Sequence, residues 1–167
     1  MDDRKWLIAV LVGLLLAVGF VYFPWGDGRR GAPKYPVTGT VFVNGEPAGG
    51  VQVRFFAADT SLVPQDQMPV AVTDVEGRFE MSSFGGGDGS AEGRYGVAFF
   101  WPTNILNPTT DRFRGRFSDP AANAFVAEVR PEPTEIPSFE ITVDPEQLLP
   151  MELSLADVAA ATQEAGQ

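Results

Sequence analysis

The fold is decided by one nonapeptide, Thr73-Asp74-Val75-Glu76-Gly77-Arg78-Phe79-Glu80-Met81. An apolar run, residues 70–72, leads into its turn, and an alternating run, residues 79–81, leads out of it. Between the two runs, Asp74 can hydrogen-bond to its own backbone and Gly77 can adopt a positive φ. Two short runs joined by such a turn predict a β-hairpin.

Alternating apolar and polar residues recur on both sides of this hairpin and predict further β-strands. The expected strands cover residues 37–43, 51–56, 68–73, 78–82, 94–101, 125–130 and 139–143, with 112–116 as an eighth. Asn44-Gly45 joins the first two runs and is a strong hairpin-turn signal. Thirteen phenylalanines can supply much of one core, each worth roughly 1.5–3 kcal/mol when fully buried. The pattern predicts an all-β fold, a single antiparallel β-sandwich of seven to eight strands over residues 37–143.

The composition excludes several kinds of chemistry. The chain has 167 residues, no cysteine and no histidine. Thiol nucleophiles, disulfides, imidazole bases and metal sites built on nitrogen or sulfur ligands are therefore excluded. The net charge is −10, and the acidic excess lies after Lys34, beyond which no lysine occurs. Such an acidic body repels nucleic acid, so nucleic-acid binding is excluded as well.

A membrane-spanning segment is expected near the N-terminus. Residues 6–23, WLIAVLVGLLLAVGFVYF, follow a short flank of residues 1–5 and contain no charge. As a helix they would span about 27 Å, close to the hydrocarbon thickness of a bilayer. A retained anchor is favoured over a cleaved signal peptide, because only Gly26 and Gly28 offer a small-residue cleavage site. Residues 24–36, rich in proline and glycine, are expected to form a linker.

The membrane orientation does not follow from charge, since basic residues flank the apolar segment on both sides. At the other end of the chain, residues 144–167 are expected to form a tail. The stretch from residue 151 to residue 163 predicts a brief helix with Leu153, Leu155 and Val158 as its apolar residues. The rest of the tail is expected to be partly disordered.

A candidate contact patch combines aromatic and basic side chains. Phe100 and Trp101 end the strand at residues 94–101 and begin a long irregular segment, and such loops often carry function. The simpler interpretation, which is favoured, is that both rings close one end of the sandwich. Arg112, Arg114 and Arg116 alternate and would display three guanidinium groups on one face of a strand. An edge strand protected by charge is favoured over an acceptor site for a carboxylate or sulfate.

The glycine-rich stretch 84–92, FGGGDGSAE, has two interpretations. Glycine-rich loops can bind phosphate, but this one lacks the spacing and the lysine of a phosphate-binding loop. It also contains Asp88 and Glu92, which would repel phosphate. A flexible connection between strands is therefore the favoured interpretation.

Several motifs occur in an order that carries a family resemblance. They are Val37–Val41, Asn44–Pro47, Gly50–Val53, Thr73–Phe79, Gly87–Gly89, Gly93–Val97 and Phe117–Pro120. In this order they resemble the carboxypeptidase regulatory-like domain, a transthyretin-like β-sandwich found in small bacterial envelope proteins. The resemblance covers about residues 36–143. It implies a non-catalytic accessory or adhesive module outside the cytoplasm, without a cofactor or metal ion, in which Gly45 and Gly77 form turns and Asp74 caps the hairpin.

The favoured function is therefore a membrane-tethered, extracytoplasmic binding or structural module that is not an enzyme. Its partner would be an envelope protein or a glycan, and the protein would be secreted if residues 6–23 were cleaved. One alternative is an envelope hydrolase of the glycosidase type. Such an enzyme needs two carboxylates, and the candidate pairs are Asp74 with Glu76 and Asp111 with Asp119. The other alternative is a Ca²⁺-binding adhesive module with ligands from residues 74–76 or 87–89.

Overall fold

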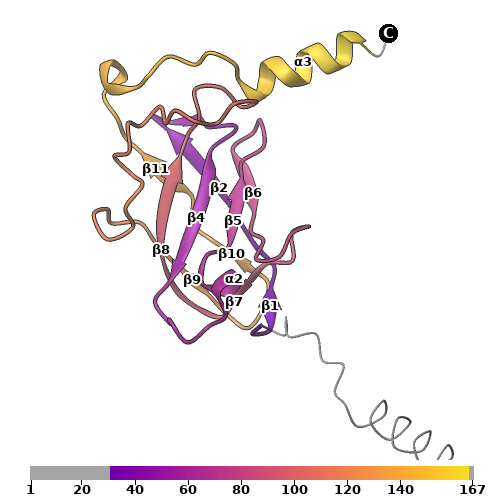
Figure 1. Ribbon diagram of the computed structural model, residues 1–167, viewed down its shortest axis with the longest axis vertical. Helices are drawn as coiled ribbons and strands as arrows, with labels where there is room; N and C mark the ends of the chain where they lie inside the picture. Colours follow the sequence, from indigo (N-terminus) through magenta and orange to yellow (C-terminus); the bar gives the residue numbers. More distant parts are fainter. Residues whose placement is uncertain (1–30, 166–167) are drawn as a thin grey trace, which may run out of the picture. The chain divides into compact units, whose positions relative to one another are not determined.

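The computed structural model describes residues 31–165, called the body below (Figure 1). The expected flank at residues 1–5 and the expected anchor at residues 6–23 lie outside the described residues. Within the body, no helix is long and apolar enough to cross a membrane.

The body is mostly β, with several antiparallel sheets and few helices, which confirms the β-rich class. One sheet has the strand order β5 (Val70–Val72), β4 (Gln52–Ala57), β8 (Gly93–Phe100), β9 (Val126–Val129). A second sheet is built around β2 (Val37–Val43), which pairs with β3 (Glu46–Pro47), β6 (Arg78–Glu80), β10 (Thr134–Glu135) and β11 (Phe139–Ile141). A small third sheet joins β1 (Lys34–Tyr35) and β7 (Ser90–Ala91). The helices are α2 (Pro64–Gln67), the 3-10 helix η1 (Pro145–Gln147) and α3 (Leu155–Ala165).

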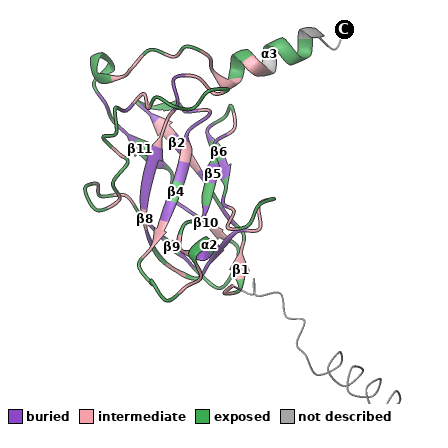
Figure 2. Ribbon diagram, in the orientation of Figure 1, coloured by how far each residue is buried: buried purple, intermediate pink, exposed green. Residues whose placement is uncertain are grey.

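One core is shared by the two larger sheets. Alternate residues of β2, β4 and β8 are buried, as the period of two along a strand requires (Figure 2). The ring of Phe99 from β8 lies edge-on to that of Phe139 from β11, with 5.2 Å between centroids. Phe125 packs edge-on against the same two rings. Aromatic side chains therefore hold the two sheets together.

Three details differ from the sequence-based expectation. Both β10 and β11 run parallel to β2, so the sheets are not purely antiparallel. The chain leaves β9 in the first sheet, turns at residues 130–133 and enters the second sheet beside β2 in the same direction. Residues 112–116 form consecutive turns rather than a strand, because Arg114 and Gly115 both have a positive φ. The expected linker ends earlier than predicted, since Lys34 and Tyr35 form β1.

The N-terminal end of the body is held by a buried carboxylate. Asp66 of α2 is fully buried; its Oδ2 accepts a hydrogen bond from the amide of Ala32 (2.8 Å). Its Oδ1 lies 2.7 Å from Nζ of Lys34, and the same ammonium group donates to the carbonyl of Ala32 (2.8 Å). Burial and, to a smaller extent, the charge of Asp66 raise the pKa of Tyr95 to about 12. We call the contacts of Asp66 with Ala32 and Lys34 the Asp66 clasp.

Two turn glycines have positive φ values that other residues adopt only with strain. Gly45 has a φ of 84° and Gly77 a φ of 77°. A Cβ atom added at Gly45 would meet nothing within 4 Å, whereas one added at Gly77 would lie 2.6 Å from the carbonyl oxygen of Val41. The amide of Val41 also donates to the carbonyl of Gly77 (2.8 Å). The turn at Gly77 is therefore fixed both by its φ and by its close approach to β2.

Replacing Gly77 by alanine is expected to lower the free energy of unfolding by about 2–3 kcal/mol, because the strained φ and the steric conflict add together. Gly45→Ala is the matched control, with the φ strain alone and an expected cost of about 1 kcal/mol. Urea-induced unfolding of the purified full chain measures both values. If both variants lost the same free energy of unfolding, the close approach of Gly77 to Val41 would not contribute to the cost.

Candidate functional site

Trp101 and Arg112, two members of the expected contact patch, are used inside the body. The indole Nε1 of Trp101 donates to the carbonyl of Gly49 (3.1 Å). The guanidinium of Arg112 lies 3.8 Å from the centroid of the Trp101 ring, and its Nε donates to the carbonyl of Leu149 (2.9 Å). Burial lowers the pKa of Arg112. Through these contacts Arg112 links Leu149, in the C-terminal segment, to Trp101 at the end of β8. Both side chains are only partly exposed.

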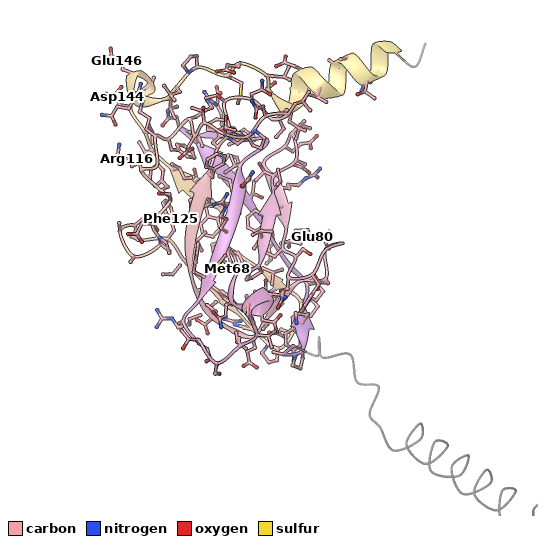
Figure 3. The ribbon with its side chains drawn as sticks, viewed as in Figure 1. Met68, Glu80, Arg116, Phe125, Asp144 and Glu146 are labelled. Carbon is pink, nitrogen blue, oxygen red and sulfur yellow. The ribbon has the colours of Figure 1, made fainter. Side chains whose placement is uncertain are left out.

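Two of the three arginines contact one C-terminal stretch, since Arg112 donates to Leu149 and Arg116 donates to Gln147. Arg116 donates through Nη1 to Oε1 of Gln147 (2.7 Å), at the same end of the body as Asp144 and Glu146 (Figure 3). Arg114 is exposed at the tip of its turn. The favoured edge strand is not formed, because residues 112–117 are consecutive turns.

Phe100, the last member of the expected patch, lies elsewhere. It is half-buried on the outer face of the four-stranded sheet, where the guanidinium of Arg54 lies 5.4 Å from its ring centroid. On β5, which lies on the other side of β4 in the same sheet, Val70 and Val72 are about half exposed. Met68, just before β5, is also about half exposed (Figure 3). We call Met68, Val70 and Val72 the β5 face. It is an exposed apolar surface that the sequence pattern did not distinguish from the core.

The carboxylates considered for a hydrolase are engaged by turns. Asp111 accepts three amide hydrogen bonds, from Trp101 (2.9 Å), Phe113 (3.1 Å) and Gly115 (2.9 Å). Asp119 accepts one from the amide of Ala121 (2.8 Å). Each carboxylate satisfies main-chain donors that its own loop leaves free, which is the usual structural role of aspartate in loops.

Asp74 stabilises the turn at residues 74–78 in the same way. The expected hairpin is wrong beyond this turn, because β5 pairs with β4 in the four-stranded sheet whereas β6 pairs with β2 in the second sheet. Its Oδ1 accepts the amides of Glu76 (3.0 Å) and Arg78 (2.9 Å), and its Oδ2 lies 2.9 Å from Nε of Arg78. The slight burial of Asp74 raises its pKa, but the hydrogen bonds and charge of Arg78 outweigh this effect and the pKa lies below its usual value.

The glycine-rich loop is closed by Asp88. Its Oδ1 accepts the hydroxyl of Ser82 (2.7 Å) and the amides of Ser83 (2.9 Å) and Phe84 (3.2 Å). Burial raises the pKa of Asp88, but these bonds, the Ser82 hydroxyl first, lower it below its usual value. The loop is thus tied by its own aspartate, a detail that the expectation of a flexible connection did not include.

The lowered pKa values of Asp74 and Asp88 predict a loss of stability in acid. A carboxyl group whose pKa is lower in the folded state contributes stability above its unfolded pKa, near 4, and loses it as the pH falls through the folded value. We therefore expect a nearly constant free energy of unfolding between pH 7 and pH 5 and a steep fall below about pH 4. Asp88→Asn should lower the free energy of unfolding by about 1 kcal/mol at pH 7. It should also make the decrease in stability below pH 4 less steep. An unchanged pH profile in that variant, followed by urea-induced unfolding, would contradict this assignment.

A groove that sequence reasoning did not predict lies beside β9. It has a volume of about 550 Å³. One side is formed by β9 and by Arg94 of β8, and the other by the chain from Glu132 to Pro137. The only sequence signal for it is the proline pair at residues 131 and 133, which separates two extended runs that then join different sheets.

The groove follows a strand edge. The amide of Val97 donates to the carbonyl of Phe125 (2.9 Å), and β8 and β9 pair antiparallel from there. The alternation of an antiparallel ladder then directs the main-chain groups of Ala127 and Val129 toward β8, and those of Val126 and Glu128 away from it. Within residues 31–165, β9 pairs with no strand other than β8. Its outer edge therefore presents unpaired main-chain donors and acceptors.

No family model matches the chain, and neither a curated protein nor a solved structure is significantly similar to it. Two segments that are far apart in the sequence lie in contact near β8. A Cβ atom added at Gly96, in the motif at residues 93–97, would lie 3.0 Å from Cβ of Pro120, in the motif at residues 117–120. A small residue at position 96 therefore allows the later loop to pack against β8.

Proposed function

We propose that the chain is a non-catalytic binding module of the cell envelope, a transthyretin-like β-sandwich of the carboxypeptidase regulatory-like type. Residues 6–23 tether it to a membrane, and the body lies outside the cytoplasm and binds another envelope protein. The observation that carries the proposal is the groove of about 550 Å³ beside the open edge of β9. An exposed strand edge is a site at which proteins bind an extended segment of a partner.

The framework around the groove supports a binding role. Ala127 and Val129 of β9 and Ile136 on the opposite side are buried in the common core, so both sides of the groove rest on packed sheets. Val126 is 61% exposed and projects from β9 beside the charged residues of the groove. A surface of this kind is preorganised, which reduces the entropy that a partner must lose on binding.

The test of this function has two parts. A protease added to intact cells is expected to remove a C-terminal tag, and carbonate extraction is expected to leave the protein with the membranes. A photo-crosslinking amino acid is then placed separately at Val126, at Val70 of the β5 face and at Leu106 of an exposed loop in the full chain. Crosslinks to an envelope protein from any of the three positions support the module. A protected tag, or no crosslink from any position, would refute it.

A further inference from the structure

We infer that the groove beside β9 accepts one extended polypeptide segment of the partner, which pairs with β9 and adds a strand to the four-stranded sheet. This inference rests on the proposed function, because it states how the partner binds. The first argument is the main-chain chemistry. The groups of Val126 and Glu128 that point away from β8 alternate donor and acceptor along the edge, and an extended main chain is the ligand that satisfies such a row.

The second argument concerns the shape of the groove. The chain from Glu132 to Pro137 stands opposite β9, so the space is bordered on two sides. One extended chain can enter such a groove along its length. The edge strand of a second folded sheet would need open space beside β9. The chain from Glu132 to Pro137 occupies that space. The geometry therefore favours a single segment over a second copy of this chain.

The third argument is the charge of the groove. Its lining contains three carboxylates, Glu128, Glu132 and Glu135, and two guanidinium groups, Arg94 and Arg130. Because the body as a whole is also acidic, an acidic segment is repelled and a neutral or basic one is favoured.

The expected segment has a definite pattern. β9 has four residues, so it can pair with about four residues of the partner over roughly 13 Å. Side chains that face the inner surface lie near Ile136 and are expected to be small or apolar. Those on the outer surface lie between Val126 and Glu128, where β-branched and basic side chains fit.

The decisive variant is Glu128→Pro. Proline lacks an amide hydrogen, and the amide of Glu128 points away from β8, so this change removes an outward donor while the bonds between β8 and β9 remain. Glu128→Ala is the matched control, since it removes the carboxylate and keeps the amide. Val126→Pro makes the same test at the second outward position if Glu128→Pro does not fold, as judged by its urea-induced unfolding.

The probe is a library of random twelve-residue peptides, selected for binding to the full chain in detergent and then synthesised. We expect the selected peptides to bind with at least tenfold lower affinity to Glu128→Pro and less than threefold lower affinity to Glu128→Ala. They are also expected to protect the amides of Val126 and Glu128 from hydrogen exchange. Failure to select any peptide, equal binding to Glu128→Pro, or protection of the β5 face instead would overturn the inference.

Two outcomes separate this inference from the proposed function. In cells, crosslinks from Val70 or Leu106 but not from Val126 would leave the binding module in place and refute strand addition at β9. Light scattering of the purified chain gives the second outcome. A dimer that Glu128→Pro dissociates would show that β9 pairs with a second copy, which would also overturn the inference.

Discussion

Replacing Phe99 by alanine is expected to lower the free energy of unfolding by about 3–5 kcal/mol, the usual cost of removing a buried ring from a core. Phe99 is fully buried, and its ring contacts Phe125 of one sheet edge and Phe139 of the other sheet. Its loss therefore leaves a cavity at the point where the two sheets meet. Since a whole domain is stable by only about 5–15 kcal/mol, this loss is a large fraction of the total stability.

The measurement is urea-induced unfolding of the full chain. Leu106→Ala is the control, because Leu106 is 72% exposed and its truncation is expected to change stability by less than about 0.5 kcal/mol. The slope of unfolding against urea should stay the same in both variants if the fold is unchanged. If the free energy of unfolding of Phe99→Ala were within about 1 kcal/mol of that of the natural protein, contacts other than those of Phe99 would hold the sheets together.

Replacing Asp66 by alanine is expected to cost about 2–3 kcal/mol, because Lys34 loses its counter-charge and the amide of Ala32 loses its acceptor. The expected loss is smaller than for a fully enclosed ion pair, since Lys34 is 15% exposed and water can reach it. We also expect a local effect of Asp66→Ala on the accessibility of β1 to protease. Trypsin should cleave after Lys34 faster than in the natural protein, because the pairing of β1 with β7 is weakened.

Asp66→Asn is the matched variant for this prediction. Its side-chain oxygen can still accept the amide of Ala32, but it carries no charge for Lys34. We therefore expect a stability and a cleavage rate between those of the natural protein and Asp66→Ala. Mass analysis of the fragments separates cleavage at Lys34 from cleavage at Arg29 and Arg30. Natural cleavage rates in both variants would show that the Asp66 clasp does not hold β1.

The β-rich class could be predicted from local pattern, because the signals that carry it are local. Alternation over a few residues fixes which side chains are buried, and the Asn44-Gly45 and Asp74–Gly77 turns fix where the chain reverses. The parallel pairing of β10 and β11 with β2 could not be predicted in this way. It depends on which sheet the chain enters after residues 130–133, and no local pattern specifies that choice.

The surfaces were less predictable than the strands. The alternating arginines at residues 112–116 have the spacing of a strand. The side chain of Asp111 accepts hydrogen bonds from amides on both sides of it, which stabilises turns there instead of a strand. The groove was missed because its two sides are adjacent in sequence but belong to different sheets, and no local pattern predicts that the chain changes sheet between them. The role of Asp66 was missed because an aspartate in a polar loop is normally exposed, and only its fold position shows that it meets Lys34.

The Asp66 clasp also determines how the body would bear a mechanical load. A pull on its N-terminal end is transmitted first to residues 31–35, which are held by a two-residue strand pair and by Asp66. Once released, these five residues can span at most about 17 Å in total before tension reaches β2, which has strand partners on both sides. Under such a pull, the Asp66 clasp is expected to open before the strand pairs of the core separate.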